Sequence, residues 1–349
     1  MRFLELSTVD GFIAFDMDCP ISAGGTRMVP DVTREETGLL ARAMTYKFAV
    51  LRQRMGGAKA GIRSGEADRE TVLTKYCEEI RPMVERGEFL TASDLGTRTQ
   101  DFLTLESSPS LMHVEGADGV TLDALVTGLG VIVAAEVAAG GLAGRTLAIE
   151  GFGKVGGAAA AEAVRRDGRV VAVSTVHGAV VDPSGLDADR LLRLRATYGD
   201  GCIEHLGLPV TPASALYEAE ADVLVPGARA GVLDARRAAA VRARLVAPAA
   251  NVPYTAAGLD ALRGRGIVAL ADFVCNAGAT MGYVAEREGR VRSVDDVRAA
   301  VEDVVEELTD TSMRHPEDPY AGACTVAEEF LRTWRPADGM PDGAPLARD

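Results

Sequence analysis

The chain has 349 residues, of which 47% are hydrophobic and 25% are charged. This length is too great for one compact core and predicts two domains, and the composition is ordinary for a globular protein. The net charge of -14 argues against a nucleic-acid or anionic-membrane partner, because the long-range field would repel both.

The cysteines and histidines are scattered along the chain. The five cysteines include no CxxC pair and the four histidines no HExxH spacing, so we expect neither a disulfide framework nor a bound metal. The N-terminal segment lacks a basic stretch followed by an apolar core, so we expect no signal peptide. Residues 122–143 are apolar but contain charged residues and glycines, which favours a buried helix over a membrane span. We therefore expect a cytoplasmic protein.

The first 120 residues mix strands and helices. Strands are predicted at 11–18, near Gly25 and at 88–92. Thr33 and Glu36 have the spacing of a capping box, which predicts that a helix with one apolar face begins there. A glycine-rich turn (MGGAKAGIRSG) and a second helix at 68–86 are predicted next.

Short apolar strands alternate with helical segments after a long helix that follows Gly119. This alternation predicts a parallel sheet covered by helices on both faces. The predicted strands are 146–150, 170–174, 222–225, 245–247 and 267–270. Ser293 and Asp296 predict the start of another helix, and the polar stretch from Arg335 predicts a frayed tail.

A GxGxxG motif lies between the first of these strands and the helix that follows. Its residues are Gly151, Phe152, Gly153, Lys154, Val155 and Gly156. Glycines at these positions allow a tight turn and close approach of the backbone to a pyrophosphate, and the helix N-terminus supplies N–H donors. This context predicts a dinucleotide site.

The acidic residue expected at the end of the second strand is missing. An Asp or Glu there would bind the ribose hydroxyls, but the chain has Thr175 followed by Val176 and His177. This weakens selection against a 2′-phosphate and tilts the prediction slightly away from strict NAD specificity. The alternative, that Asp182 or a backbone group binds the ribose, remains open.

Two lysines in the N-terminal half suggest acid–base chemistry. Lys47 lies on or beside the apolar face of a predicted helix, where a lysine is unfavourable unless it meets an anion. Lys59 is framed by glycines, and Asp94 follows in TASDLGT. Two lysines in one cleft would lower each other's pKa, as would burial, so that one serves as general acid–base while the other holds a carboxylate.

Several sequence blocks occur together in order along residues 12–335. They are SAGGTRM, AMTYKFA, GGAKAGI, TASDLGT, TGLGV, EGFGKVG, PAANVP and DFVCNAGA. With these blocks the chain resembles the glutamate/leucine/phenylalanine/valine dehydrogenases, and it is more similar to members acting on apolar amino acids than to glutamate dehydrogenase. The resemblance implies reversible oxidative deamination of an L-amino acid to its 2-oxo acid and ammonia, with NAD or NADP.

The resemblance also implies residue roles. Lys47 matches the lysine that binds the substrate α-carboxylate, Lys59 the catalytic lysine, and Asp94 the aspartate that relays protons to the amine. Further residues match positions that line the substrate and cofactor cleft. These are Gly24, Gly25, Thr127, Asn251 and Asn276.

The implied fold is α/β, with a catalytic domain and a Rossmann-type, doubly wound dinucleotide-binding domain on either side of a cleft. We predict a catalytic and oligomerisation domain at 1–125, joined by a C-terminal helix at about 311–335. The Rossmann domain is predicted at 126–310 and a flexible tail at 336–349. We expect a homo-oligomer, a dimer or higher.

Three positions depart from the pattern of the resembled family. Ala23 stands where glutamate-specific members have a lysine for the distal carboxylate, and Tyr283 lies near the position of a serine in those members. Both favour an apolar or aromatic substrate rather than glutamate. Ala279 replaces a glycine, and its methyl group would crowd the nicotinamide.

Two other hypotheses are consistent with the sequence. The first is a biosynthetic relative with an atypical oxo acid or amine, suggested by Ala23, Thr175 and Ala279. The second is a homologue that senses a dinucleotide or other ligand without turnover. Lys47, Lys59 and Asp94 argue against the second, because a protein without catalytic activity has no need for three ionisable groups at one site.

Overall fold

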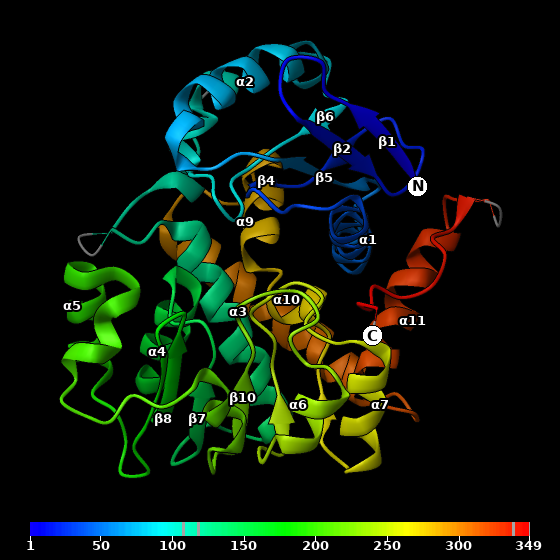
Figure 1. Cartoon of the computed structure of the whole chain (residues 1–349). Coiled ribbons are helices and arrows are strands. Elements are labelled where there is room, and N and C mark those ends of the chain that lie inside the picture. Colours follow the sequence, from blue (N-terminus) through cyan, green and yellow to red (C-terminus); the bar gives the residue numbers. More distant parts are fainter. Residues whose placement is uncertain (107–108, 117–118, 337–338, 349) are drawn as a thin grey trace. The chain divides into compact units, whose positions relative to one another are not determined.

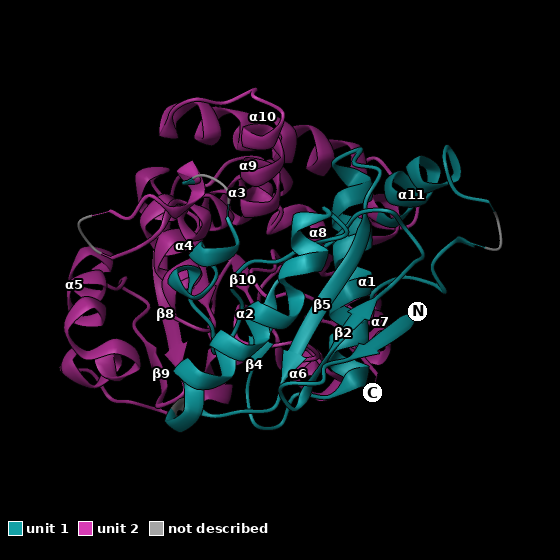
Figure 2. Cartoon of the chain, turned by 90° about the horizontal axis from the view of Figure 1, so that it is seen from above, with its two compact units in different colours: residues 1–109, 324–345 teal, residues 110–323, 346–349 magenta. Residues whose placement is uncertain are grey.

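The computed structural model describes residues 1–106, 109–116, 119–336 and 339–348. The chain divides into two compact units (Figure 2): unit 1 comprises Met1–Pro109 and Cys324–Pro345, and unit 2 comprises Ser110–Ala323 and Leu346–Asp349. The first segment of unit 1 therefore ends before the predicted domain boundary between residues 125 and 126, and that boundary stays a prediction.

Unit 1 is built on a mixed sheet (Figure 1) in the order β1-β2-β5-β3-β6, with β4 also paired to β5. Its strands are β1 (Arg2–Glu5), β2 (Gly11–Phe15), β3 (Ser22–Ala23), β4 (Thr26–Met28), β5 (Gly56–Ile62) and β6 (Phe89–Leu90). Its helices are α1 (Arg34–Val50) and α2 (Arg69–Glu85), and α11 (Pro319–Arg332) runs across the division between the units. The predicted strands and both predicted helices of this region are present.

The glycine-rich segment predicted as a turn is instead the central strand β5, so that prediction was wrong. All seven residues of β5 are buried, and α1 packs against them. A Cβ on Gly57 would clash with the carbonyl oxygen of Ala41 in α1, and the Gly57 N–H donates to the Thr45 hydroxyl at 3.0 Å. The small residues are required by this close approach of helix and strand, which the local sequence does not reveal.

Unit 2 is a doubly wound sheet in the order β12-β11-β10-β7-β8-β9. Its strands are β7 (Thr146–Ile149), β8 (Arg169–Thr175), β9 (Gly178–Val181), β10 (Val223–Val225), β11 (Leu245–Val246) and β12 (Val268–Ala269). The five predicted strands are confirmed and pair in parallel, but β9, which was not predicted, pairs antiparallel with β8.

Helices and short 3₁₀ turns accompany this sheet. The helices are α3 (Leu122–Ala139), α4 (Lys154–Arg165), α5 (Ala188–Tyr198), α6 (Ala235–Ala240), α7 (Ala256–Gly264), α8 (Asp272–Cys275), α9 (Gly278–Arg287) and α10 (Val294–Met313). The 3₁₀ turns of unit 2 include η4 (Leu111–His113), η5 (Gly199–His205) and η6 (Ala213–Glu218). Ser293 and Asp296 form the predicted capping box of α10.

Helix α3 is long and apolar enough to cross a membrane by length and composition, but 61% of it is buried inside the structure. It packs against α4, α9 and α10. This is the environment of a core helix, as the sequence predicted.

The segment expected to be a frayed tail makes specific contacts. The buried Arg42 of α1 pairs with Asp16 at 2.6 Å and donates to the carbonyl oxygens of Asp342 at 2.7 Å and Gly343 at 3.1 Å. Within unit 2, the N–H of Ala347 donates to the carbonyl oxygen of Tyr254 at 2.9 Å. The end of the chain is therefore tied to folded parts of the molecule.

Candidate active site and dinucleotide site

A buried cluster of charges lies in unit 1, where β4, β5 and the loop after β6 meet. The ammonium group of Lys59 lies 3.0 Å from the Asp94 carboxylate, and the Arg27 guanidinium lies 2.8 Å from the same oxygen, Oδ2. Arg27 also pairs with Glu36 at 2.6 Å. Lys59 is 4% exposed and Arg27 is 8% exposed. Two cations thus converge on one carboxylate oxygen away from water.

Burial and charge shift the pKa values of this cluster in a definite direction. Burial lowers the pKa of Lys59 below its ordinary value of 10.5; the positive charge of Arg27 adds to this, and Asp94 opposes it. Burial alone would raise the pKa of Asp94, but the charges of Lys59 and Arg27 outweigh it and hold that pKa well below its usual range. Arg27 is therefore a cation that lowers the pKa of Lys59, and Arg27 had no role assigned from the sequence.

The backbone around the cluster explains its glycines. A Cβ on Gly24 would overlap the carbonyl oxygen of Ala58 in β5, and one on Gly25 would lie 2.9 Å from the carbonyl oxygen of Ser93. The hydroxyl of Thr97 accepts from the Asp94 N–H at 2.9 Å and donates to the carbonyl oxygen of Thr26 at 2.8 Å. Gly24 and Gly25 therefore let the chain around β4 lie close to both β5 and the Asp94 loop.

The predicted capping box at the start of α1 is half formed. The Thr33 hydroxyl accepts from the N–H of Glu36 at 3.2 Å, but the Glu36 carboxylate binds Arg27. The first turn of α1 thus helps to hold Arg27 beside Asp94.

Lys47 and Ala23 lie on elements that adjoin β5. Lys47 is 4% exposed on α1, the helix that packs on β5. Ala23, on β3 beside β5, belongs to an apolar cluster with Phe48 and Met55. Ile21, Met44 and Leu90 complete the cluster. The surroundings of Ala23 in this cluster are thus hydrocarbon and thioether groups.

The predicted GxGxxG turn joins β7 to α4 in unit 2. Gly151 has φ +74°, a conformation that favours glycine, and a Cβ on Gly156 would clash with the carbonyl oxygen of Gly151. Gly153 begins α4 without a side-chain cap, and a Cβ there would meet nothing nearer than Gly151 O at 4.0 Å. The space at Gly153 and the uncapped helix N-terminus fit a pyrophosphate.

This turn lies where the strand order of the sheet reverses. The chain passes from β7 to β8 on one side and later returns to β10 on the other side of β7. Dinucleotides bind at such a switch point, outside the carboxyl ends of the strands.

Glu150, directly before Gly151, is buried at this point. Its carboxyl group accepts a hydrogen bond from the Tyr217 hydroxyl and a long one, 3.4 Å, from the N–H of Ala228. Burial raises the pKa of Glu150, although these hydrogen bonds oppose the rise. The group links the end of β7 to the loop after β10.

The end of β8 lies beside the glycine turn. The Phe152 N–H donates to the carbonyl oxygen of Ser174 at 2.8 Å. Thr175 comes next, and its hydroxyl accepts from the N–H of His177 at 3.2 Å. The His177 ring pairs with Glu204 of η5 at 2.9 Å. A carboxylate that is distant in sequence therefore lies close to the position where Thr175 replaces the expected acid.

Asp182 does not supply that carboxylate. Its N–H donates to the carbonyl oxygen of Val171, near the opposite end of β8, and its carboxylate binds Ser184. The alternative that assigned Asp182 to the ribose is therefore wrong.

The other predicted cleft residues of unit 2 lie around α3, α8 and α9. The Asn276 amide donates to Asn251 at 3.1 Å, and the Thr127 hydroxyl donates to the carbonyl oxygen of Asp123 at 2.7 Å. A Cβ on Gly278 would lie against the backbone of α3 at Val126 and Thr127. The structure thus joins Asn251 to Asn276 and packs the start of α9 on α3.

Val252, next to Asn251, has φ +52°, which is rare for a β-branched residue. Its N–H donates to the buried Asp272 carboxylate at 2.8 Å. The surrounding structure therefore holds a strained backbone beside the Asn251–Asn276 pair, a feature that is often found at functional sites.

Tyr283 of α9 lies against His113 of η4. The tyrosine hydroxyl lies 3.0 Å from the His113 Nε2, and the rings meet edge to face. Ala279, on the first turn of α9, is partly exposed. The pairing of Tyr283 with His113 was not foreseen from the sequence.

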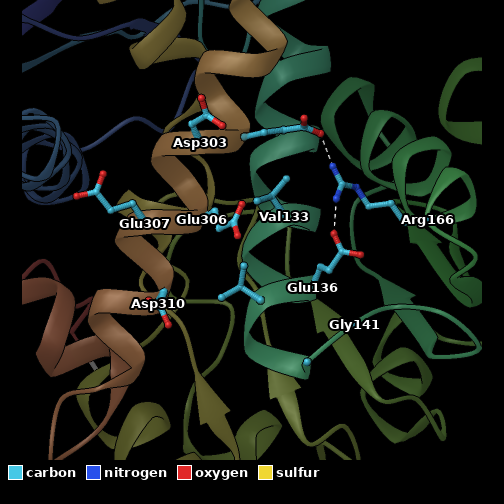
Figure 3. A pocket seen from close by; sticks show the side chains of 11 residues that line it. Val133, Glu136, Gly141, Arg166, Asp303, Glu306, Glu307 and Asp310 are labelled. Carbon is cyan, nitrogen blue, oxygen red and sulfur yellow. Dashed lines mark hydrogen bonds and ion pairs between the residues drawn. The ribbon is translucent and has the colours of Figure 1, made fainter.

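A surface hollow of about 740 Å³ lies elsewhere on unit 2, between α3 and α10 (Figure 3). It is lined by six acidic side chains and one arginine, Arg166, which pairs with Glu136 and Glu302. None of the predicted site residues lines it. Its charge is unsuited to an anionic dinucleotide or oxo acid. Among the described residues, no group of three or more His, Cys, Asp or Glu could hold a metal ion.

Sequence reasoning missed three charged residues of these sites. Arg27 was part of a quoted motif but had no role, Glu150 precedes the glycine turn, and Glu204 lies in an unassigned segment. Arg27 and Glu150 could have been found from the sequence, since both belong to the conspicuous blocks SAGGTRM and EGFGKVG. Nothing near Glu204 in the sequence indicates a role for it.

Two family models match the chain. The model described as "Glutamate/Leucine/Phenylalanine/Valine dehydrogenase" matches residues 119–332, and the model described as "Glu/Leu/Phe/Val dehydrogenase, dimerisation domain" matches residues 5–107. Together they cover both units.

Curated relatives and solved structures agree with these matches. The NADP-specific glutamate dehydrogenase of Saccharolobus shibatae is 31% identical over 288 residues, 75% of this chain and 67% of the relative. The NAD-specific glutamate dehydrogenase A of Halobacterium salinarum is 30% identical over 292 residues, 74% of this chain and 64% of the relative. The chain thus spans about two thirds of the length of these relatives. The Leu-bound hetero-hexameric glutamate dehydrogenase of Thermus thermophilus aligns with TM-score 0.81 and 27% identity, covering 97% of this chain and 89% of that one.

Proposed function

Because the chain belongs to the Glu/Leu/Phe/Val dehydrogenase family, we propose that it catalyses the reversible oxidative deamination of an L-amino acid with a neutral side chain. In that reaction the amino acid, water and NAD(P)⁺ give the 2-oxo acid, ammonium, NAD(P)H and a proton. The nicotinamide, when bound, supplies the hydride chemistry, and the protein orients the reactants and moves protons.

The observation that carries the proposal is the Asp94 carboxylate held between the two buried cations Lys59 and Arg27. A lysine whose pKa is lowered by burial loses its proton more readily than an exposed one, so Lys59 is suited to take a proton from water or to donate one to a developing oxyanion. Asp94, kept anionic by its two cations, is suited to accept a hydrogen bond from the substrate amine.

Lys47 is the residue that we assign to the substrate α-carboxylate. It is buried on the helix that packs on the strand of Lys59. A buried ammonium group is stabilised by an anion, and the amino acid and the oxo acid both carry one.

The surroundings of Ala23 support a neutral substrate side chain. A distal carboxylate beside Ala23 would meet the apolar side chains of Phe48 and Met55, which are unfavourable surroundings for a charge. Tyr283, which lies near the position of a serine in glutamate-specific members, is a bulky ring packed on His113 and also favours this assignment. We therefore propose an apolar or aromatic amino acid.

We further propose that the chain forms homo-oligomers through unit 1. The support is the match of residues 5–107 to a family model described as a dimerisation domain. Light scattering coupled to gel filtration would test it, and a monomer at micromolar concentration would contradict it.

The experiment that tests the proposed reaction is a substrate panel. Purified protein is mixed with ammonium, NADH or NADPH, and a series of 2-oxo acids that includes 2-oxoglutarate, and the absorbance of the reduced nicotinamide is followed. Consumption with apolar or aromatic oxo acids supports the proposal. Turnover of 2-oxoglutarate alone would contradict the substrate assignment, and dinucleotide binding without any turnover would favour a ligand sensor.

A pair of lysine variants tests the assignment of Lys59. Lys59→Ala should lower turnover by at least about a hundredfold, because a general acid–base is lost. Lys75→Ala removes an exposed lysine of α2 and should leave turnover unchanged. Near-normal turnover in Lys59→Ala, with an unaltered circular-dichroism spectrum, would remove Lys59 from the mechanism.

A further inference from the structure

The carboxyl end of β8 carries an arrangement that the missing acid at Thr175 leaves unexplained. Thr175 pairs with Gly178 across the hairpin, so Val176 and His177 form its tip. Val176 is 83% exposed, and His177 meets Glu204. The tip adjoins the glycine turn through the bond from Phe152 to Ser174.

The partners of Thr175 leave it poorly placed to bind a ribose. Its hydroxyl already accepts the N–H of His177, and the residue is 8% exposed. An ionised carboxylate can accept from two ribose hydroxyls, whereas the Thr175 hydroxyl has one lone pair left and carries no charge to repel a 2′-phosphate. A carboxylate does lie at the hairpin tip, because that of Glu204 is 2.9 Å from the His177 ring.

Glu204 reaches this position because η5 packs against both β8 and β9. Its side chain is 52% exposed and that of His177 is 45% exposed, so the pair is open to solvent at the carboxyl edge of the sheet. An ion pair this exposed contributes little to folding. Both groups are therefore available to a ligand at the edge where a dinucleotide lies.

We propose that Glu204, oriented by His177, takes the place of the missing acid at the end of β8 and selects NAD(H) over NADP(H). The carboxylate accepts the 2′- and 3′-hydroxyls of the adenosine ribose, and its negative charge repels a 2′-phosphate. Val176 offers an apolar surface to the adenine. The inference rests on the proposed dinucleotide-dependent reaction and deepens it by naming the form of the cofactor.

The test is direct binding, which needs no turnover. The dissociation constants of NADH and NADPH are measured by calorimetry for the wild-type chain and for Glu204→Gln. Wild type should bind NADH more tightly, and Glu204→Gln should shift the ratio of the two constants toward NADPH by about tenfold. An unchanged ratio, or a wild-type chain that binds NADPH at least as tightly, would overturn the inference.

Asp182→Asn is the matched control, because it removes one negative charge from the same hairpin without touching its tip. The ratio should not change in this variant. An equal shift in Asp182→Asn and Glu204→Gln would mean that net charge, rather than a placed carboxylate, sets the preference, and would also overturn the inference.

Two further variants separate contact from positioning. Thr175→Asp, introduced into Glu204→Gln, should restore the preference for NADH, because it returns a carboxylate to the end of β8. His177→Ala should weaken NADH binding in the wild-type background but not in Glu204→Gln, since His177 acts through Glu204. Equal effects of His177→Ala in both backgrounds would contradict its positioning role.

The two proposals fail in different ways. If the dissociation constants of NADH and NADPH change as predicted in Glu204→Gln but no amino acid is turned over, the proposed reaction is overturned and the cofactor assignment is supported. Turnover with an unchanged ratio in Glu204→Gln would do the reverse.

Discussion

Each unit buries a carboxyl group at its candidate site, and the two groups are stabilised by opposite means. In unit 1, Asp94 meets the charges of Lys59 and Arg27, which hold its pKa well below the usual range. In unit 2, Glu150 meets a phenol and backbone N–H groups, and burial raises its pKa. The comparison shows two electrostatic settings: an anion held between two cations in unit 1, and in unit 2 a carboxyl group whose charged form burial disfavours.

The largest expected effect is that of Asp94→Asn. The change leaves two buried cations without their shared anion, so it should destabilise the protein by about 3–5 kcal/mol. It should also lower turnover by at least about a hundredfold, because a group that handles protons is lost. Urea unfolding and the oxo-acid assay measure the two effects. Asp10→Asn, which breaks an exposed pair with Arg63, is the control and should change stability by less than about 0.5 kcal/mol. Similar losses in both variants would contradict the contrast between buried and exposed pairs.

The next effect concerns glycines that serve different purposes in the two units. Gly153→Ala should leave stability nearly unchanged, because its Cβ meets no atom nearer than 4.0 Å, but should weaken dinucleotide binding by about tenfold or more. Gly57→Ala should instead lower the melting temperature, because its Cβ would clash with the Ala41 carbonyl oxygen. Thermal unfolding and calorimetry distinguish the two, and a stable Gly57→Ala would show that α1 can withdraw from β5.

The two carboxyl groups also predict opposite dependences of stability on pH. The pKa of Asp94 is lowered in the folded state, so its contribution is present above its unfolded value of about 3.9 and is lost as pH falls through the folded value. The pKa of Glu150 is raised, so its contribution is complete below about pH 4.3 and is lost as pH rises through the folded value. Melting curves of wild type, Asp94→Asn and Glu150→Gln across this range measure both. If Asp94→Asn, rather than Glu150→Gln, abolished the loss of stability with rising pH, the assignment would be refuted.

The smallest expected effect is that of Glu150→Gln, the same acid-to-amide change as Asp94→Asn. A glutamine keeps an oxygen for the Ala228 N–H and a polar partner for Tyr217, so stability should change by less than about 1 kcal/mol. Glu150→Ala should cost more, since it leaves the buried phenol without its acceptor. If Glu150→Gln destabilised the protein as much as Asp94→Asn, Glu150 would have to be an anion in the folded state.

The parts of the fold that were predicted are those in which neighbouring residues determine the structure. The strand–GxGxxG–helix unit and the capping box at Ser293 and Asp296 depend on residues a few positions apart. The strand β5 was missed because its glycines and alanines lack β propensity, and only α1 packed on it makes them necessary. Strand β9 was missed because its segment directly follows β8 and shows no boundary of its own.

The candidate site was also predicted only in part. Lys59 and Asp94 were singled out, and the structure places them in contact. Arg27, however, reaches Asp94 across 67 positions of sequence, and Tyr217 reaches Glu150 across the same separation. Contacts of this kind arise from the strand order, which no single segment of the sequence specifies.

The anchoring of the C-terminal segment affects how the protein is best handled. Because the Arg42 guanidinium holds the carbonyl groups of Asp342 and Gly343, and Ala347 pairs with Tyr254, these last residues belong to the folded structure. An affinity tag fused there would disturb the contacts of this segment with Arg42 of α1 and with Tyr254 of unit 2. A stop codon placed after Trp334 should yield a chain more susceptible to proteases than the full-length one.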